Sequence, residues 1–155
     1  MEKKKSLEWR NCSEENLFSE IADWVKEYCG PGTLLFLEGE MGSGKSTFAR
    51  AVIRHLAKDT LSHGSPTFPL VHEYRSDQGF PIYHIDLYRL KSEEELELSG
   101  IAEQIDSRDA LVLIEWGSMF SGFFSSYSHA RSGKRVYGIE ISVQGEKRDY
   151  KIRRP

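Results

Sequence analysis

Residues 39–46, GEMGSGKS, combine glycine, lysine and serine at the spacing of a phosphate-binding loop. Glycine lets successive backbone N–H groups converge on phosphate oxygens, and the start of a following helix adds partial positive charge. In such a loop Lys45 reaches the β- and γ-phosphates, and the hydroxyl of Ser46 binds Mg²⁺. The pattern therefore predicts a nucleotide site. The residues expected to contact the nucleotide are Glu40, Met41, Gly42, Ser43, Gly44, Lys45, Ser46 and Thr47.

Two acidic residues are candidates for the metal and the attacking water of a nucleotide hydrolase. Glu115 ends the apolar run LVLIE, and open α/β sheets bind ligands at the carboxyl ends of their strands. Asp86, in HIDLYRL, lies at or just past the end of the regular part of a second predicted strand. We expect both acids to be catalytic together with Lys45, and we expect Ser46 and Glu115 to hold the metal. Two alternatives to these catalytic roles stay open: Glu115 as a surface carboxylate, and Asp86 as a turn or capping residue. Which of the two acids contacts Mg²⁺ directly also stays open.

Two further side chains suit the nucleotide site, and two histidines raise the question of a metal site. Thr67, in SPTF, offers a hydroxyl or carbonyl to the γ-phosphate, as ordered switch loops do, although a plain turn explains it equally well. Trp116 could cover the nucleotide or belong to the core. His72 and His84 lack a third ligand at metal-binding spacing, so we expect structural or hydrogen-bonding roles for them.

The predicted elements place the glycine-rich loop between a buried strand and an amphipathic helix. The continuous apolar run at 33–37 suits a strand that is buried on both faces, as in a parallel sheet. Residues 117–135 show no clear period, and we expect a mobile loop there. Helices are predicted over 13–28, 44–58 and 92–98, and the last of these can resume after Gly100. Strands are predicted over 33–37, 70–74, 81–88, 110–116, 135–143 and 148–152. We expect one hairpin from 70–74 and 81–88, and another from 135–143 and 148–152.

Length and composition indicate one domain over residues 1–155, with residues 1–10 loosely ordered. The net charge of −3 excludes a global basic field of the kind that binds nucleic acid, so basic contacts would be local, at 3–5 or 147–154. Two cysteines are too few for a disulfide framework, and no apolar run approaches the roughly 18 residues of a membrane span. We therefore expect a cytoplasmic protein.

The kind of nucleotide enzyme is narrowed by what the chain lacks. A GTPase would carry a guanine-binding Asn-Lys-x-Asp stretch, and none is present, so we favour ATP. One interpretation is a small-molecule kinase in which ARSGKR, at 130–135, forms a cationic lid. The other is an ATPase whose hydrolysis drives a conformational cycle in partner proteins, which needs no acceptor pocket.

Four segments together resemble the TsaE (YjeE) family: GEMGSGKSTFAR, SPTFPLVHEY, HIDLYRL and LIEW, in this order. The similarity covers about residues 13–116. It implies a three-layer P-loop fold with a mixed, mainly parallel sheet and antiparallel hairpins, and Mg²⁺-dependent ATP hydrolysis. It also implies action on the complex of TsaB and TsaD, which makes threonylcarbamoyladenosine (t6A) at position 37 of tRNA. The tRNA would be contacted only through that complex, and the protein alone would be a monomer.

The resemblance also assigns roles by motif. Lys45 and Ser46 would bind phosphate and Mg²⁺, Thr67 would belong to a switch-like segment, and Trp116 would lie beside the nucleotide. Asp86 and Glu115 would be the acids of hydrolysis. The family commonly has a second glutamate two positions after its Glu-Trp pair, where this chain has Ser118. Residues 119–128 match the family poorly, so no function is carried onto them.

Overall fold

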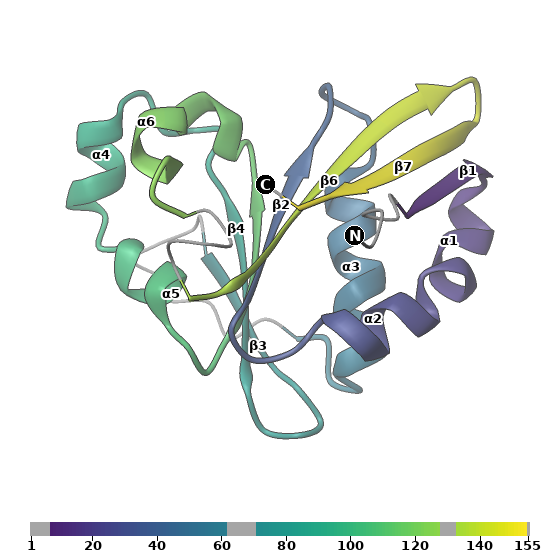
Figure 1. Cartoon of the computed structure of the whole chain (residues 1–155), viewed down its shortest axis with the longest axis horizontal. Helices are drawn as coiled ribbons and strands as arrows, with labels where there is room; N and C mark the ends of the chain where they lie inside the picture. The colour runs from purple at the N-terminus through teal and green to yellow at the C-terminus, as the bar shows by residue number, and fades with distance from the viewer. Residues whose placement is uncertain (1–6, 62–70, 128–132, 155) are drawn as a thin grey trace, which may run out of the picture.

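A single mixed β-sheet runs through the middle of the molecule (Figure 1), in a computed structural model that describes residues 7–61, 71–127 and 133–154. Within those residues the sheet has seven strands in the order β1-β7-β6-β2-β5-β4-β3. The inner strands β6, β2, β5 and β4 are parallel neighbours, whereas β3 pairs with β4, β7 with β6 and β1 with β7 antiparallel. The strands are β1 (Glu8–Cys12), β2 (Thr33–Glu38), β3 (Val71–Arg75), β4 (Pro81–Asp86), β5 (Leu111–Glu115), β6 (Arg135–Gln144) and β7 (Lys147–Arg153).

Helices cover both faces of the sheet and make a three-layer molecule (Figure 1). Along β5, Leu111 and Leu113 join one apolar cluster while Val112 and Ile114 join the other, because successive side chains of a strand point to opposite faces. This explains the unbroken apolar run in the sequence and confirms the predicted fold. The first face carries α1 (Glu14–Glu20), α2 (Ala22–Tyr28) and α3 (Lys45–Leu56); the second carries α4 (Glu93–Leu98), α5 (Ala102–Asp106), the 3₁₀ helix η1 (Gly117–Phe120) and α6 (Ser121–Phe124).

Most predicted elements are confirmed, with small changes at their boundaries. The helix expected over 13–28 is interrupted at Ile21, although Ser13 caps its start by accepting a hydrogen bond from the N–H of Asn16. Ser92 caps α4 in the same way through the N–H of Glu95. Both hairpins form, and the helix resumes after Gly100 as α5. None of the helices in the described part of the chain has the length and apolarity that crossing a bilayer requires.

Two expectations about irregular structure were wrong for part of the residues that they covered. Residues 1–10 were expected to be loosely ordered, yet 8–10 belong to β1, which extends the sheet beside β7. Residues 117–135 were expected to form a mobile loop, yet 117–124 form η1 and α6. The reason is burial of aromatic side chains: Phe120 is 3% exposed, and the ring of Phe124 packs edge-on against Phe36 at 5.1 Å.

Candidate functional site

The glycine-rich loop connects the end of β2 to the start of α3, as the sequence predicts. Gly44 caps α3 with φ = 104°, and Gly42 has φ = 77°, a left-handed conformation that residues with a Cβ rarely adopt. A Cβ on Gly39 would lie 2.5 Å from Ser43 Oγ and 2.8 Å from the carbonyl oxygen of Ile141. These positions therefore require glycine, two for backbone conformation and one for space.

The amino-terminal end of α3 is electrostatically open to an anion. This 12-residue helix has no side-chain hydrogen bond at its cap and no acidic residue in its first turn. The unpaired N–H groups of such a helix end and the partial positive charge of its dipole favour phosphate. The local structure thus matches the chemistry that the loop sequence predicts.

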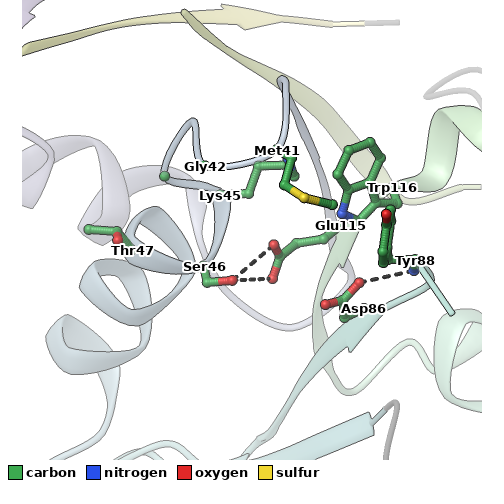
Figure 2. Close-up of a pocket in the computed structure, with 10 residues that line it drawn as sticks. Met41, Gly42, Lys45, Ser46, Thr47, Asp86, Tyr88, Glu115 and Trp116 are labelled. Carbon is green, nitrogen blue, oxygen red and sulfur yellow. Dashed lines mark hydrogen bonds between the residues drawn. The ribbon is translucent and has the colours of Figure 1, made fainter. Parts of the chain in front are cut away.

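A hollow of about 370 Å³ lies in front of this helix end (Figure 2). It gathers loop residues, both predicted acids and two aromatic rings from segments far apart in the chain. Glu40 and Ser43, also predicted to contact nucleotide, do not line it: Glu40 is exposed, and the buried Ser43 hydroxyl has no hydrogen-bond partner among the described residues. The lining residues are Met41, Gly42, Gly44, Lys45, Ser46, Thr47, Asp86, Tyr88, Glu115 and Trp116.

Lys45 is held inside its own loop. Its ammonium donates hydrogen bonds to the carbonyl oxygens of Gly39 at 2.7 Å and Glu40 at 2.9 Å, and it lies 4.0 Å from the ring centroid of Trp116. The side chain is buried, and this burial lowers the pKa of Lys45, although Glu115 and Asp86 act in the opposite direction. The cation is therefore fixed beside the hollow by groups that a phosphate can replace.

Glu115 is the most enclosed acid of the site, at 3% exposed. Its carboxylate accepts a hydrogen bond from the Ser46 hydroxyl, which is 3.0 Å from each oxygen, and its Oε2 lies 2.5 Å from Nε2 of His84. Burial pushes the pKa of Glu115 up, but the hydrogen bond and charge of His84, the hydroxyl of Ser46 and the charge of Lys45 outweigh it. The net pKa lies below the ordinary value, so the carboxylate is ionised.

Asp86 and Glu115 lie next to each other because their strands are parallel and in register. Asp86 is the partner of Glu115 in the β4–β5 pairing, so both acids end at the same edge of the sheet. Asp86 also accepts a hydrogen bond from the N–H of Tyr88 at 3.0 Å. The turn role is therefore confirmed for Asp86, which also lines the hollow, and its catalytic role stays a prediction.

Trp116 lies at the turn after β5 in a left-handed conformation, with φ = 65°. Its ring packs against Tyr88 at 5.0 Å, stands over the Lys45 ammonium and also contacts the core of the second face. At the next residue, Gly117, an added Cβ would lie 2.8 Å from the ring of Phe36, which would have to shift. A non-glycine residue at positive φ is uncommon and is enriched at functional sites.

The sequence missed two residues of this site. Tyr88 lines the hollow, and His84 contacts Glu115 from behind it. One signal was present: His84 lies two residues before Asp86 on a strand, so both share a face. The hydrogen-bonding role expected for His72 and His84 is confirmed for His84, which pairs with Glu115. Thr67 and residues 130–132 of the proposed lid lie outside the described residues.

The donor set suits Mg²⁺ that is shared with a nucleotide. A hydroxyl oxygen and a carboxylate, from Ser46 and Glu115, face the hollow, and Mg²⁺ prefers oxygen ligands, often one or two carboxylates completed by phosphate and water. In the described part of the chain no group of three or more His, Cys, Asp or Glu side chains could hold a metal by itself. The residues present therefore fit a metal bound together with phosphate oxygens.

A family model described as "Threonylcarbamoyl adenosine biosynthesis protein TsaE" matches residues 12–150. A relative from Rickettsia felis is 37% identical over 99 residues, which are 64% of this chain and 56% of that protein. A Bacillus subtilis relative is 35% identical over 115 residues, which are 74% of this chain and 69% of that protein. A Haemophilus influenzae relative is 37% identical over 105 residues, which are 68% of this chain and 63% of that protein. All three are described as tRNA threonylcarbamoyladenosine biosynthesis protein TsaE.

Similarity also extends to a solved fold. The crystal structure of Bacillus subtilis YdiB superposes with a TM-score of 0.66, covering 98% of this chain and 87% of that chain at 24% identity. The match supports the arrangement of the sheet and its helices. The aligned region spans less than two thirds of the Rickettsia relatives, between 56% and 60% of their length.

Proposed function

The chain belongs to the TsaE family of threonylcarbamoyl adenosine biosynthesis proteins, and we propose from this premise that it is an Mg²⁺-dependent ATPase of tRNA t6A formation. The observation that carries the proposal is the meeting of Lys45, Ser46, Asp86 and Glu115 around one hollow at the start of α3. The family and its curated relatives are named for this tRNA modification. Hydrolysis, the partners and the role of each residue are our inference.

The geometry suggests a division of labour for hydrolysis. Lys45 and the start of α3 would stabilise the charge that develops on the transferred phosphoryl group. We assign the metal to Ser46 and Glu115, because their oxygens already lie 3.0 Å apart. Bound there, Mg²⁺ would supply charge neutralisation to the phosphates. Asp86, beside Glu115 and less buried, is then free to orient the attacking water.

ATPase activity is tested most directly with the purified chain. We expect release of inorganic phosphate from ATP, in preference to GTP, and complete dependence on Mg²⁺. Lys45→Ala should abolish nucleotide binding or turnover, while Lys147→Ala, on the exposed hairpin end, should not. Unchanged turnover in Lys45→Ala would show that the hollow is not the site of hydrolysis.

The partner part of the proposal has a separate test. We propose that the protein is cytoplasmic, is a monomer alone and acts on the TsaB–TsaD complex to support its repeated turnover, with tRNA contacted only through that complex. Adding purified TsaB and TsaD should stimulate the ATPase and give a nucleotide-dependent complex. Failure to associate in any nucleotide state would contradict it. Transfer of labelled phosphate to a small hydroxylated acceptor would favour a kinase instead.

A further inference from the structure

His84 and Glu115 form a buried contact behind the hollow. Their side chains are 10% and 4% exposed, and His84 Nε2 lies 2.5 Å from Glu115 Oε2. The contact joins residues 31 apart in sequence, on the parallel strands β4 and β5. His84 is two residues before Asp86, on the same face of β4, but it does not line the hollow. It therefore touches the acid and not the space in front of it.

Two donors hold the Glu115 carboxylate from two different elements. The Ser46 hydroxyl comes from α3 and His84 from β4. A buried carboxylate is costly unless its oxygens are hydrogen-bonded, and a hydrogen bond to a charged acceptor is stronger than a neutral one. Ser46 is the residue that phosphate and metal chemistry would engage. His84 does not line the hollow, so a metal–phosphate ligand bound there would leave its hydrogen bond to Glu115 in place.

We propose that His84 is a positioning residue for the reaction, holding the Glu115 carboxylate in the orientation in which it and Ser46 receive the metal–nucleotide complex. This inference rests on the proposed ATPase function and names a residue that supports it. Hydrogen bonds behind metal-binding side chains orient them, and their loss commonly costs about 10- to 100-fold in metal affinity or activity. A histidine that only fills the core would not have this effect.

Two amide variants separate positioning from packing. Glutamine places an N–H donor near the position of His Nε2, whereas asparagine is shorter and does not reach it. We expect His84→Asn to lower kcat about 10- to 100-fold and to raise the Mg²⁺ concentration at half-saturation by a similar factor. His84→Gln should recover most of both losses. The affinity for ATP in EDTA, measured by calorimetry, should change less than about threefold in either variant, because phosphate contacts remain.

His72 provides a matched control. It lies directly opposite His84 in the β3–β4 pairing but is exposed. His72→Asn should leave the Mg²⁺ requirement unchanged. The enhancement of ATP affinity by Mg²⁺, measured by calorimetry with and without the metal, adds a readout that needs no hydrolysis. It should shrink in His84→Asn and be preserved in His84→Gln.

Several outcomes would overturn the proposal. Equal Mg²⁺ requirements in wild type, His84→Asn and His84→Gln would do so, as would losses that follow only the fall in thermal stability of each variant. If the wild type hydrolyses no ATP, the proposed function fails by itself. The calorimetric comparison then still decides whether His84 controls metal-assisted nucleotide binding.

Discussion

Two glutamates end neighbouring parallel strands of the same sheet and have opposite surroundings. Glu115 ends β5 and accepts hydrogen bonds from Ser46 and His84, which together with Lys45 hold its pKa below the ordinary value despite burial. Glu38 ends β2 and lines a second hollow of about 350 Å³ beside Phe36 and Phe124. Burial and the neighbouring carboxylate of Glu140 raise its pKa, against the lowering effect of Arg153.

The difference shows that two acids at the ends of neighbouring strands can have opposite electrostatic surroundings. Both residues follow apolar runs, TLLFLE and LVLIE, at the carboxyl edge of the sheet. Only Glu115 faces the start of α3 and meets donors there, whereas Glu38 points to the other face of the sheet and shares its surroundings with aromatic rings. The arrangement of donors, set by which face each side chain occupies, gives the two carboxyl groups pKa values shifted in opposite directions.

The largest expected effect is on catalysis. Glu115→Gln should lower the ATPase rate about 10²-fold or more, since it removes a charge that the reaction needs at the site. Glu38→Gln makes the same chemical change at the other strand end and should leave the rate within about twofold. Steady-state phosphate release at saturating ATP and Mg²⁺ measures both. Comparable losses in the two variants would mean that the second hollow also takes part in the reaction.

The next largest effect is on the free energy of unfolding, when a methyl group is added to the glycine that follows each strand end. Gly39→Ala would press a methyl group against the fixed carbonyl oxygen of Ile141, 2.8 Å away, and should lower the free energy of unfolding by about 2–3 kcal/mol. The close contacts of Gly117→Ala are with the ring of Phe36, which borders the second hollow and can shift. We expect about 1 kcal/mol there. Urea unfolding of both variants tests this order.

Nucleotide binding separates the two glycine variants further. Gly39 belongs to the phosphate-binding loop, so its variant should also bind ATP more weakly, whereas Gly117→Ala should change ATP affinity little. Gly138→Ala is the control on β6, since its added Cβ would be 4.0 Å from the nearest backbone oxygen. A larger loss of stability in Gly117→Ala than in Gly39→Ala would contradict the rigidity assigned to the loop.

Local signals predicted the parts of this site, and long-range pairing determined how they meet. Glycine chemistry and the 3.6-residue period placed the loop and α3, and the apolar run placed the end of β5 at Glu115. The contact between His84 and Glu115 depends on β4 lying beside β5, a strand order that no local pattern specifies. The same holds for the opposite faces of Glu38 and Glu115.

The elements that the sequence missed are short and irregular. β1 has no regular alternation of apolar residues and contains Asn11 at φ = 58°, where its register with β7 shifts. η1 and α6 have four residues each, too few to show a helical period. The helices η1 and α6 are held in place by the packing of their aromatic rings onto Phe36 and its neighbours, and this packing depends on the finished sheet.

The smallest expected effect is the pH dependence of stability, and its sign differs between the two glutamates. The folded pKa of Glu115 is lowered, so its stabilising contribution is fully present above the unfolded value of about 4.5 and is lost as pH falls through the folded value. The folded pKa of Glu38 is raised, so its contribution is present below about 4.5 and is lost as pH rises through the folded value. At neutral pH the ionised Glu38 therefore opposes folding.

Urea unfolding of metal-free protein between pH 4 and pH 7 distinguishes these signs. At pH 7 Glu38→Gln should stabilise the fold, by less than about 0.5 kcal/mol because water screens this half-buried carboxylate, and the gain should vanish toward pH 4. Glu115→Gln should destabilise at pH 7, and this loss should shrink below about pH 4.5 as the wild type loses its advantage. Glu140→Gln removes the carboxylate that raises the pKa of Glu38 and should therefore reduce the gain from Glu38→Gln. If Glu38→Gln destabilises at pH 7, the Glu38 carboxylate has a favourable partner in the folded protein, and the contrast between the two strand ends fails.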